Sequence, residues 1–291
     1  MIYIDDLGSQ CVDFLIGLLG QFASAYTSDP EIALVTEYDF RSVFEYLNRH
    51  ADPERSAEVG QLEWVFLTAL GSEPPVDQLH ETLAADPDFF VKVMEVAWRA
   101  SDAEPDEAEE QDGGTAPEDE PLTEQQVQQA ENGFMLLTSF DRLPGTGPHG
   151  GVDPAALKQW VTRVLELAAA SGRRRVAEAL IGQILASAPA DDDGTWPCRP
   201  VRDLLEELQS ERAERNLAVR LYNRRGVTVR DPEDGGRQER TLVEQYRAQA
   251  TAFSDSWPQT AAVLRNLAEM YDKDAREEEN RAERFRQGQQ K

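Results

Sequence analysis

Apolar residues recur at three- and four-residue spacing through almost the whole chain, and this periodicity restricts the fold more than any other feature of the sequence. Such spacing gathers apolar side chains on one side of an α-helix. Only residues 226–230 alternate as a strand would. The sequence therefore predicts an all-α protein, an irregular array of antiparallel helix hairpins, with solenoid-like stacking as an open alternative. The clearest periodic run comprises Cys11, Val12, Leu15, Ile16, Leu18, Leu19 and Phe22.

Capping and turn-forming residues indicate where the helices begin and end. Asp86 and Pro87 predict a helix start, because Asp accepts hydrogen bonds from free backbone N–H groups and Pro fits the first helical turn. The nearly all-apolar stretch 61–70 is expected at the centre of the first core. Further helices are predicted at residues 122–140, 153–170, 173–187, 200–222, 237–253 and 256–285, with loops at 143–151, 188–200 and 223–236.

The most acidic segment, residues 101–121, predicts a disordered linker. It contains ten acidic residues, no basic residue and three prolines. Such a composition buries too little apolar surface to offset the entropy lost on ordering. The expected organisation is therefore an acidic helical domain at 1–100, an acidic flexible linker at 101–121 and a charge-balanced helical domain at 122–291.

The net charge of −26 is concentrated before residue 151. Residues 1–100 have a net charge of −13, residues 101–150 of −12, and residues 151–291 of only −1. Proteins that coat nucleic acid need clustered Lys and Arg, so this distribution argues against direct nucleic-acid binding by residues 1–150. The expected partner is another protein with a basic surface.

Motifs that would identify a reaction are missing from the sequence. It contains no GxxxxGK[ST], HExxH, CxxC or GxSxG pattern, and its three histidines are isolated. No catalytic residue, metal ligand or cofactor is predicted, and an enzyme is not favoured. Cys198 is the better of the two thiol candidates, because Arg199 and Arg202 beside it would lower its pKa. The run Asp191–Gly194 is expected to be a turn and a helix cap.

A cluster of arginines between residues 215 and 240 stands out in this acidic chain, with no acidic residue from 215 to 230. Guanidinium groups beside a glycine-containing loop bind phosphate or carboxylate well. The alternatives are ion pairs with neighbouring acids such as Glu206 and Glu214, docking against the acidic half of the chain, or a weak nucleic-acid contact. The candidate contact residues are Arg220, Arg224, Arg225, Arg230, Arg237 and Arg240.

Tryptophans supply a second set of candidates. Trp196 and Trp257 each precede a proline where a helix is expected to begin. They are expected to fasten loops, or, if exposed, to contact a partner. The remaining three, Trp64, Trp98 and Trp160, lie in apolar helical patterns and are expected in the core.

A cytoplasmic location without a membrane segment is expected. The N-terminus has Asp5 and Asp6 but no basic region of the signal-peptide type. The most apolar run, residues 14–20, is far shorter than the roughly 20 residues that span a bilayer.

Four blocks, at residues 79–94, 193–208, 223–250 and 257–285, together resemble the C-terminal helical region of large uncharacterised bacterial proteins, some in phage-defence or toxin–antitoxin neighbourhoods. Those proteins are much longer, and the resembling part follows their presumed effector. The resemblance carries no catalytic motif. It implies a helical interaction or regulatory module, acting as a sensor or adaptor in a bacterial defence system.

Two other functions remain open from the sequence. The acidic half could act as a DNA mimic that inhibits a nucleic-acid-binding protein. Alternatively, the arginine-rich loop 220–240 could bind a nucleotide or another phosphorylated ligand.

Overall fold

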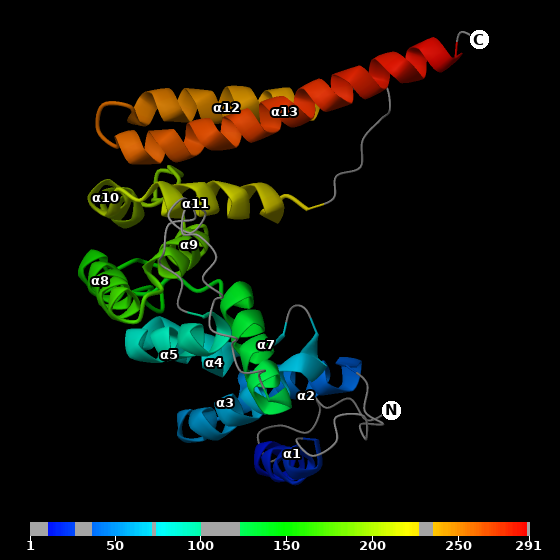
Figure 1. Cartoon of the computed structure of the whole chain (residues 1–291), viewed down its shortest axis with the longest axis vertical. Helices are drawn as coiled ribbons and strands as arrows, with labels where there is room; N and C mark the ends of the chain where they lie inside the picture. The colour runs from blue at the N-terminus through cyan, green and yellow to red at the C-terminus, as the bar shows by residue number, and fades with distance from the viewer. Residues whose placement is uncertain (1–10, 27–36, 72–73, 100–122, 227–234, 290–291) are drawn as a thin grey trace, which may run out of the picture. The chain divides into compact units, whose positions relative to one another are not determined.

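The computed structural model describes residues 11–26, 37–71, 74–99, 123–226 and 235–289 (Figure 1). These residues form twelve α-helices and two short 3-10 helices. In the same ranges the single extended pairing is an isolated bridge between Thr146 and Val152, and no strand forms. The protein is therefore all-α, as its periodicity predicts. The acidic tract 101–121 and residues 227–234 of the arginine-rich loop lie outside the described residues.

The chain divides into two compact units, Met1–Arg142 with Thr162–Arg174, and Leu143–Val161 with Arg175–Lys291. The first unit contains α1 (Val12–Tyr26), α2 (Glu37–His50), η4 (Pro53–Arg55), α3 (Ser56–Val65), η5 (Leu67–Leu70), α4 (Asp77–Ala85), α5 (Pro87–Ala97), α7 (Glu124–Ser139) and the last turns of α8 (Pro154–Ala170). The second contains the start of α8, nearly all of α9 (Arg174–Leu185), α10 (Arg199–Leu208), α11 (Glu211–Arg224), α12 (Arg237–Phe253) and α13 (Pro258–Gln289).

This division differs from the expected boundary, because α7 belongs to the first unit and not to a domain that starts at residue 122. The reason is its contact with α5. A Cβ atom added at Gly133 would lie 3.1 Å from the carbonyl oxygen of Val93, so the glycine lets the two backbones approach closely. The side-chain amide of Asn132 also donates to the carbonyl of Trp64 at 3.0 Å.

The core of the first unit is built from aromatic and aliphatic side chains of α2, η5, α5 and α7. The ring of Phe66 contacts Phe40 and Phe44 at centroid distances of 5.0 and 6.1 Å. Farther along, Phe90 of α5 contacts Phe140, which follows α7. These five aromatic side chains are all buried, and that of Phe66 has no exposure to solvent.

In the second unit, α12 and α13 form a long antiparallel hairpin (Figure 1). Tyr246 and Tyr271 stack between them with an interplanar angle of 5°. The helix predicted at 237–253 is confirmed as α12. The single helix predicted at 200–222 is wrong. Gln209 adopts a left-handed conformation with φ of 45°, and Ser210 then caps a new helix.

Within the described part of the chain, no helix is both long enough and apolar enough to cross a membrane.

Candidate functional site

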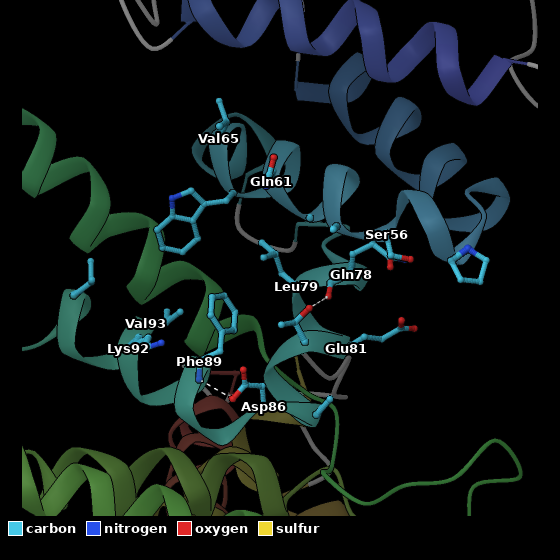
Figure 2. Close-up of a pocket in the computed structure, with 17 residues that line it drawn as sticks. Ser56, Gln61, Val65, Gln78, Leu79, Glu81, Asp86, Phe89, Lys92 and Val93 are labelled. Carbon is cyan, nitrogen blue, oxygen red and sulfur yellow. Dashed lines mark hydrogen bonds between the residues drawn. The ribbon is translucent and has the colours of Figure 1, made fainter.

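An apolar groove of about 990 Å³ lies in the first unit between α3, α4 and α5 (Figure 2). We call it the α3–α5 groove. Its polar lining residues, most of which are exposed, are Ser56, Gln61, Gln78, Glu81, Thr82, Asp86 and Lys92. Its apolar lining residues are Pro53, Ala57, Gly60, Trp64, Val65, Leu79, Ala85, Phe89, Val93 and Val96.

Helical spacing explains why these residues share one groove. On α3 the lining positions include 57, 60, 61 and 64, with 56 and 65 beside them, and on α5 they are 89, 92, 93 and 96. Both sets follow the i, i+3, i+4, i+7 rule that selects one side of a helix. Small residues on α3 leave space between the helices. The larger lining side chains are also accessible, since Phe89 and Trp64 are half-buried and Val96 is 45% exposed. The groove is therefore an accessible apolar surface.

Glu63 joins the α3 and α4 walls of this groove. Its side chain is fully buried and accepts hydrogen bonds from the backbone N–H groups of Leu79 at 2.9 Å and Gln78 at 3.3 Å. These donors lie in the first turn of α4, where helical N–H groups lack partners within the helix. Burial raises the pKa of Glu63 to about 7, against the opposing effect of the Leu79 hydrogen bond.

The turn from α4 to α5 is held by the cap that the sequence predicts. The Asp86 carboxylate accepts from the N–H groups of Asp88 at 2.9 Å and Phe89 at 3.1 Å. Figure 2 shows this contact beside Phe89 at the groove. The cap orients the first turn of α5, so it positions Phe89 against the groove.

Acidic residues outnumber basic ones on the elements that form the groove. The described residues from Pro53 to Ala97 contain eight acidic side chains and two basic ones, and of the acids only Glu63 is buried. Four of these acids form ion pairs. Arg142 contacts Asp77 at 2.6 Å and Glu81 at 2.9 Å, Arg163 contacts Asp88 at 2.7 Å, and Arg55 contacts Glu58 at 3.0 Å. Even with these pairs counted, the three walls have a negative net charge.

The arginine cluster is used within the second unit. Arg225 donates to the buried carboxylate of Glu239 at 2.8 Å, and its guanidinium group lies 5.5 Å from the Tyr271 ring centroid. Arg240 binds Glu279 through two hydrogen bonds of 2.8 and 2.9 Å and contacts Asp272 at 2.5 Å.

The other candidate arginines do not converge on one site. Arg224 donates to the carbonyl of Ala186 at 2.7 Å, Arg220 is half-buried on α11, and Arg237 is exposed on α12. Arg230 lies outside the described residues. The structure therefore favours the ion-pair interpretation for Arg225 and Arg240.

The acids that pair with these arginines are not the ones the sequence suggested. The partners Glu239, Asp272 and Glu279 lie on α12 and α13. Glu206, a suggested partner, instead accepts from the N–H groups of Gln259 at 3.0 Å and Thr260 at 3.1 Å. It caps α13 from α10, as Glu63 caps α4 from α3.

Trp196 and Trp257 are half-buried and pack against the same cluster, formed by Ala250, Phe253, Ala261 and Leu264. Their indole N–H groups are used internally. Trp196 donates to the carbonyl of Ala188 and Trp257 to the carboxylate of Asp203, at 2.9 and 2.8 Å. Both tryptophans thus fasten loops to the core, which is the first of their two expected roles.

The expectation of a low pKa at Cys198 is wrong. The thiol is buried, and desolvation raises its pKa. The guanidinium group of Arg202 is engaged elsewhere, because it pairs with Asp191 and lies 4.2 Å from the Trp257 ring centroid. Asp191 also accepts from the backbone N–H of Arg199, so the acidic run 191–194 forms the predicted turn and cap.

Sequence reasoning missed the α3–α5 groove. Trp64 was expected in the core but lines the groove. The signal that points to it is the row of small residues Ser56, Ala57 and Gly60 on the same side of α3 as Trp64.

In the described ranges, no three His, Cys, Asp or Glu side chains are grouped as metal ligands.

Comparisons with protein-family models, with curated proteins and with solved structures find no significant match to this chain.

Proposed function

We propose that this chain is a non-enzymatic protein-interaction module and that its partner binds in the α3–α5 groove. The observation that carries the proposal is the groove itself, a mainly apolar hollow of about 990 Å³ between three helices. Covering apolar surface contributes about 25 cal/mol per Å², so an open apolar groove is a source of binding energy. The excess of acidic side chains on the elements that form it favours a partner with a basic surface.

The proposed biological setting is a bacterial defence system, in which the module acts as sensor or adaptor. Support for this setting comes from the resemblance of residues 79–94, 193–208, 223–250 and 257–285 to a helical region of larger bacterial proteins. The first of those blocks covers all of α4 after its first two residues and the first turns of α5, which form two walls of the groove.

A second candidate function is supported by charge. The first unit contains 32 acidic and nine basic residues, a net charge of −23. Such a surface suits a DNA mimic that occupies the basic site of a nucleic-acid-binding protein. Association through charge alone weakens steeply with salt, whereas association through an apolar groove does not. Salt dependence of binding therefore separates the two candidates.

A pull-down from the native cell with a groove-filling variant tests the first proposal. Ala57 is exposed and lines the groove, so Ala57→Phe places a ring in it without disturbing the core. The matched control is Ala169→Phe, an exposed alanine on α8 outside the groove lining. Loss of one co-purifying protein with Ala57→Phe alone supports the proposal. Equal retention by both variants contradicts it.

A further inference from the structure

We infer that the α3–α5 groove binds an amphipathic helix whose apolar side enters the groove and whose flanks are basic. This inference rests on the proposed function and specifies the partner's chemistry. The groove is walled by helices with one apolar side each, and a helix lying between helices is the packing that such walls accept. Its occupant thus completes a helical layer that the described residues of the first unit leave open.

The dimensions of the groove suit three turns of helix. α3 has ten residues and α5 has eleven, which correspond to lengths of about 15 and 16 Å. Anchors at positions i, i+4 and i+7 of a partner helix span about 10 Å and fit along these walls. Ala57 and Gly60 lie on the α3 wall, and such small residues let a partner backbone approach closely.

Binding as an added β-strand is disfavoured, because the described ranges contain no strand whose edge an extended peptide would join. Charge then selects among helices. Glu81 in the middle of α4 and Asp86 at the α4–α5 turn line the groove. Glu54 in η4, Glu58 in the first turn of α3 and Glu95 near the end of α5 lie on the same elements. Within the described residues of 53–97, these exposed acids outnumber the two basic residues, Arg55 and Lys92, and Arg142 from outside this range pairs with Glu81.

Arg55 is itself neutralised by Asp13 at 2.7 Å and by Glu58 at 3.0 Å. Lys or Arg residues beside the apolar stripe of a partner helix therefore meet opposite charge on these elements. A second copy of this chain is a poorer occupant, because two first units of net charge −23 repel each other.

Labelled synthetic peptides test the inference on the full-length protein. The first is about four turns of helix with Leu at i, i+4 and i+7 and Lys at the other positions. The second replaces every Lys by Glu. The third keeps the first composition but has Pro at two interior positions, which prevents helix formation. Fluorescence anisotropy at physiological salt should show the first peptide binding at least about tenfold more tightly than either of the others.

Two protein variants locate the binding. Ala57→Phe should weaken the first peptide at least about tenfold, whereas Ala169→Phe should leave its affinity unchanged. Equal binding of the Glu peptide would overturn the charge requirement, and equal binding of the Pro peptide would overturn the helical one. A concentration-dependent dimer in sedimentation equilibrium that Ala57→Phe abolishes would overturn the inference in favour of self-association.

The inference and the proposed function fail in different ways. If none of the peptides binds but Ala57→Phe still loses the cellular partner, the inference is overturned and the proposed function stands. If Ala57→Phe retains that partner as well, both are overturned.

Discussion

The carboxylate of Glu63 on α3 accepts a hydrogen bond from the backbone N–H of Leu79 on α4 at 2.9 Å, with no exposure to solvent. A buried carboxylate prefers its proton, and desolvation raises the pKa of Glu63 to about 7. His80, the next residue on α4, is also buried, and desolvation lowers its pKa to about 4. The pKa values of these two buried groups thus shift in opposite directions.

These shifts give opposite pH dependences. Between pH 4.5 and 7 the folded state retains a proton on Glu63 that the unfolded chain releases, so the contribution of Glu63 to stability falls as pH rises. Between pH 4 and 6.5 the unfolded chain protonates His80 and the folded state does not, so the contribution of His80 rises with pH. Their slopes cancel where the two windows overlap.

Glu63→Gln should therefore reveal how His80 alone makes the stability depend on pH. We expect the free energy of unfolding of the wild type, relative to Glu63→Gln, to fall by up to about 3 kcal/mol between pH 4.5 and 7.5. Because only the difference between two proteins is compared, the other carboxylates cancel. Hydrogen exchange of the α3 and α4 amides at several pH values measures it.

The matched variant His80→Gln should show the opposite sign. The wild type should gain stability relative to His80→Gln as pH rises from 4 to 6.5, because desolvation and, to a smaller extent, Arg142 lower the pKa of the imidazole more than Asp141 and Asp77 raise it. Slopes of the same sign in both variants would contradict the assigned pKa directions.

Apolar periodicity predicted the helices well but did not predict which helices pack against each other. Residues 237–253 form the predicted helix: Gly236 immediately precedes its apolar repeat, and Phe253 is its last residue. The break at Gln209 was missed, because glutamine is not a residue that signals a left-handed conformation. The assignment of α7 failed because apolar spacing shows which side of a helix is covered but not which helix covers it.

The same limit applies to the candidate sites. Apolar positions on α3 and α5 read as core in the sequence, and only the positions of α3, α4 and α5 together show that Trp64 and Val96 remain accessible. For the arginines, charge balance correctly suggested pairing, but the partners depend on the α12–α13 hairpin. Glu239 and Glu279 are distant from Arg225 and Arg240, respectively, in the sequence, but they contact them in the fold.

Removing Arg225 should destabilise the second unit strongly. The Glu239 side chain is 1% exposed, so Arg225→Ala leaves a buried carboxylate without its main cation. Breaking one partner of a buried ion pair costs about 3–5 kcal/mol, whereas replacing both by apolar residues is close to neutral. Urea unfolding of Arg225→Ala and of Arg225→Met/Glu239→Leu should show this difference. Equal losses in both variants would mean that packing, and not charge pairing, dominates at this position.

Gly182 on α9 should not tolerate a side chain. A Cβ atom at this position would lie 2.2 Å from the carbonyl oxygen of Ala213 on α11, a backbone atom that has no freedom to turn aside. We expect Gly182→Ala to reduce the free energy of unfolding of the second unit by about 1–3 kcal/mol or more. Urea titration followed by hydrogen exchange in α9 and α11 measures the loss.

Gly60 is the control, since it is also a buried glycine within a helix. There a Cβ atom would meet its neighbours at 3.7 Å or more, which is ordinary contact. Gly60→Ala should raise the stability of the first unit by about 0.5–1 kcal/mol, because alanine loses less backbone entropy on folding. A stabilising Gly182→Ala would show that α9 and α11 are farther apart than described.

The two cysteines should differ in reactivity toward iodoacetamide. The thiolate is the reacting form, and burial both shields Cys198 and raises its pKa, whereas Cys11 is only partly buried. At pH 8 in native buffer, peptide mass spectrometry should therefore find Cys11 alkylated before Cys198. In concentrated urea, where burial is lost, the two rates should become similar. Faster native labelling of Cys198 would instead mean that Arg202 acts on the thiol and not on Asp191.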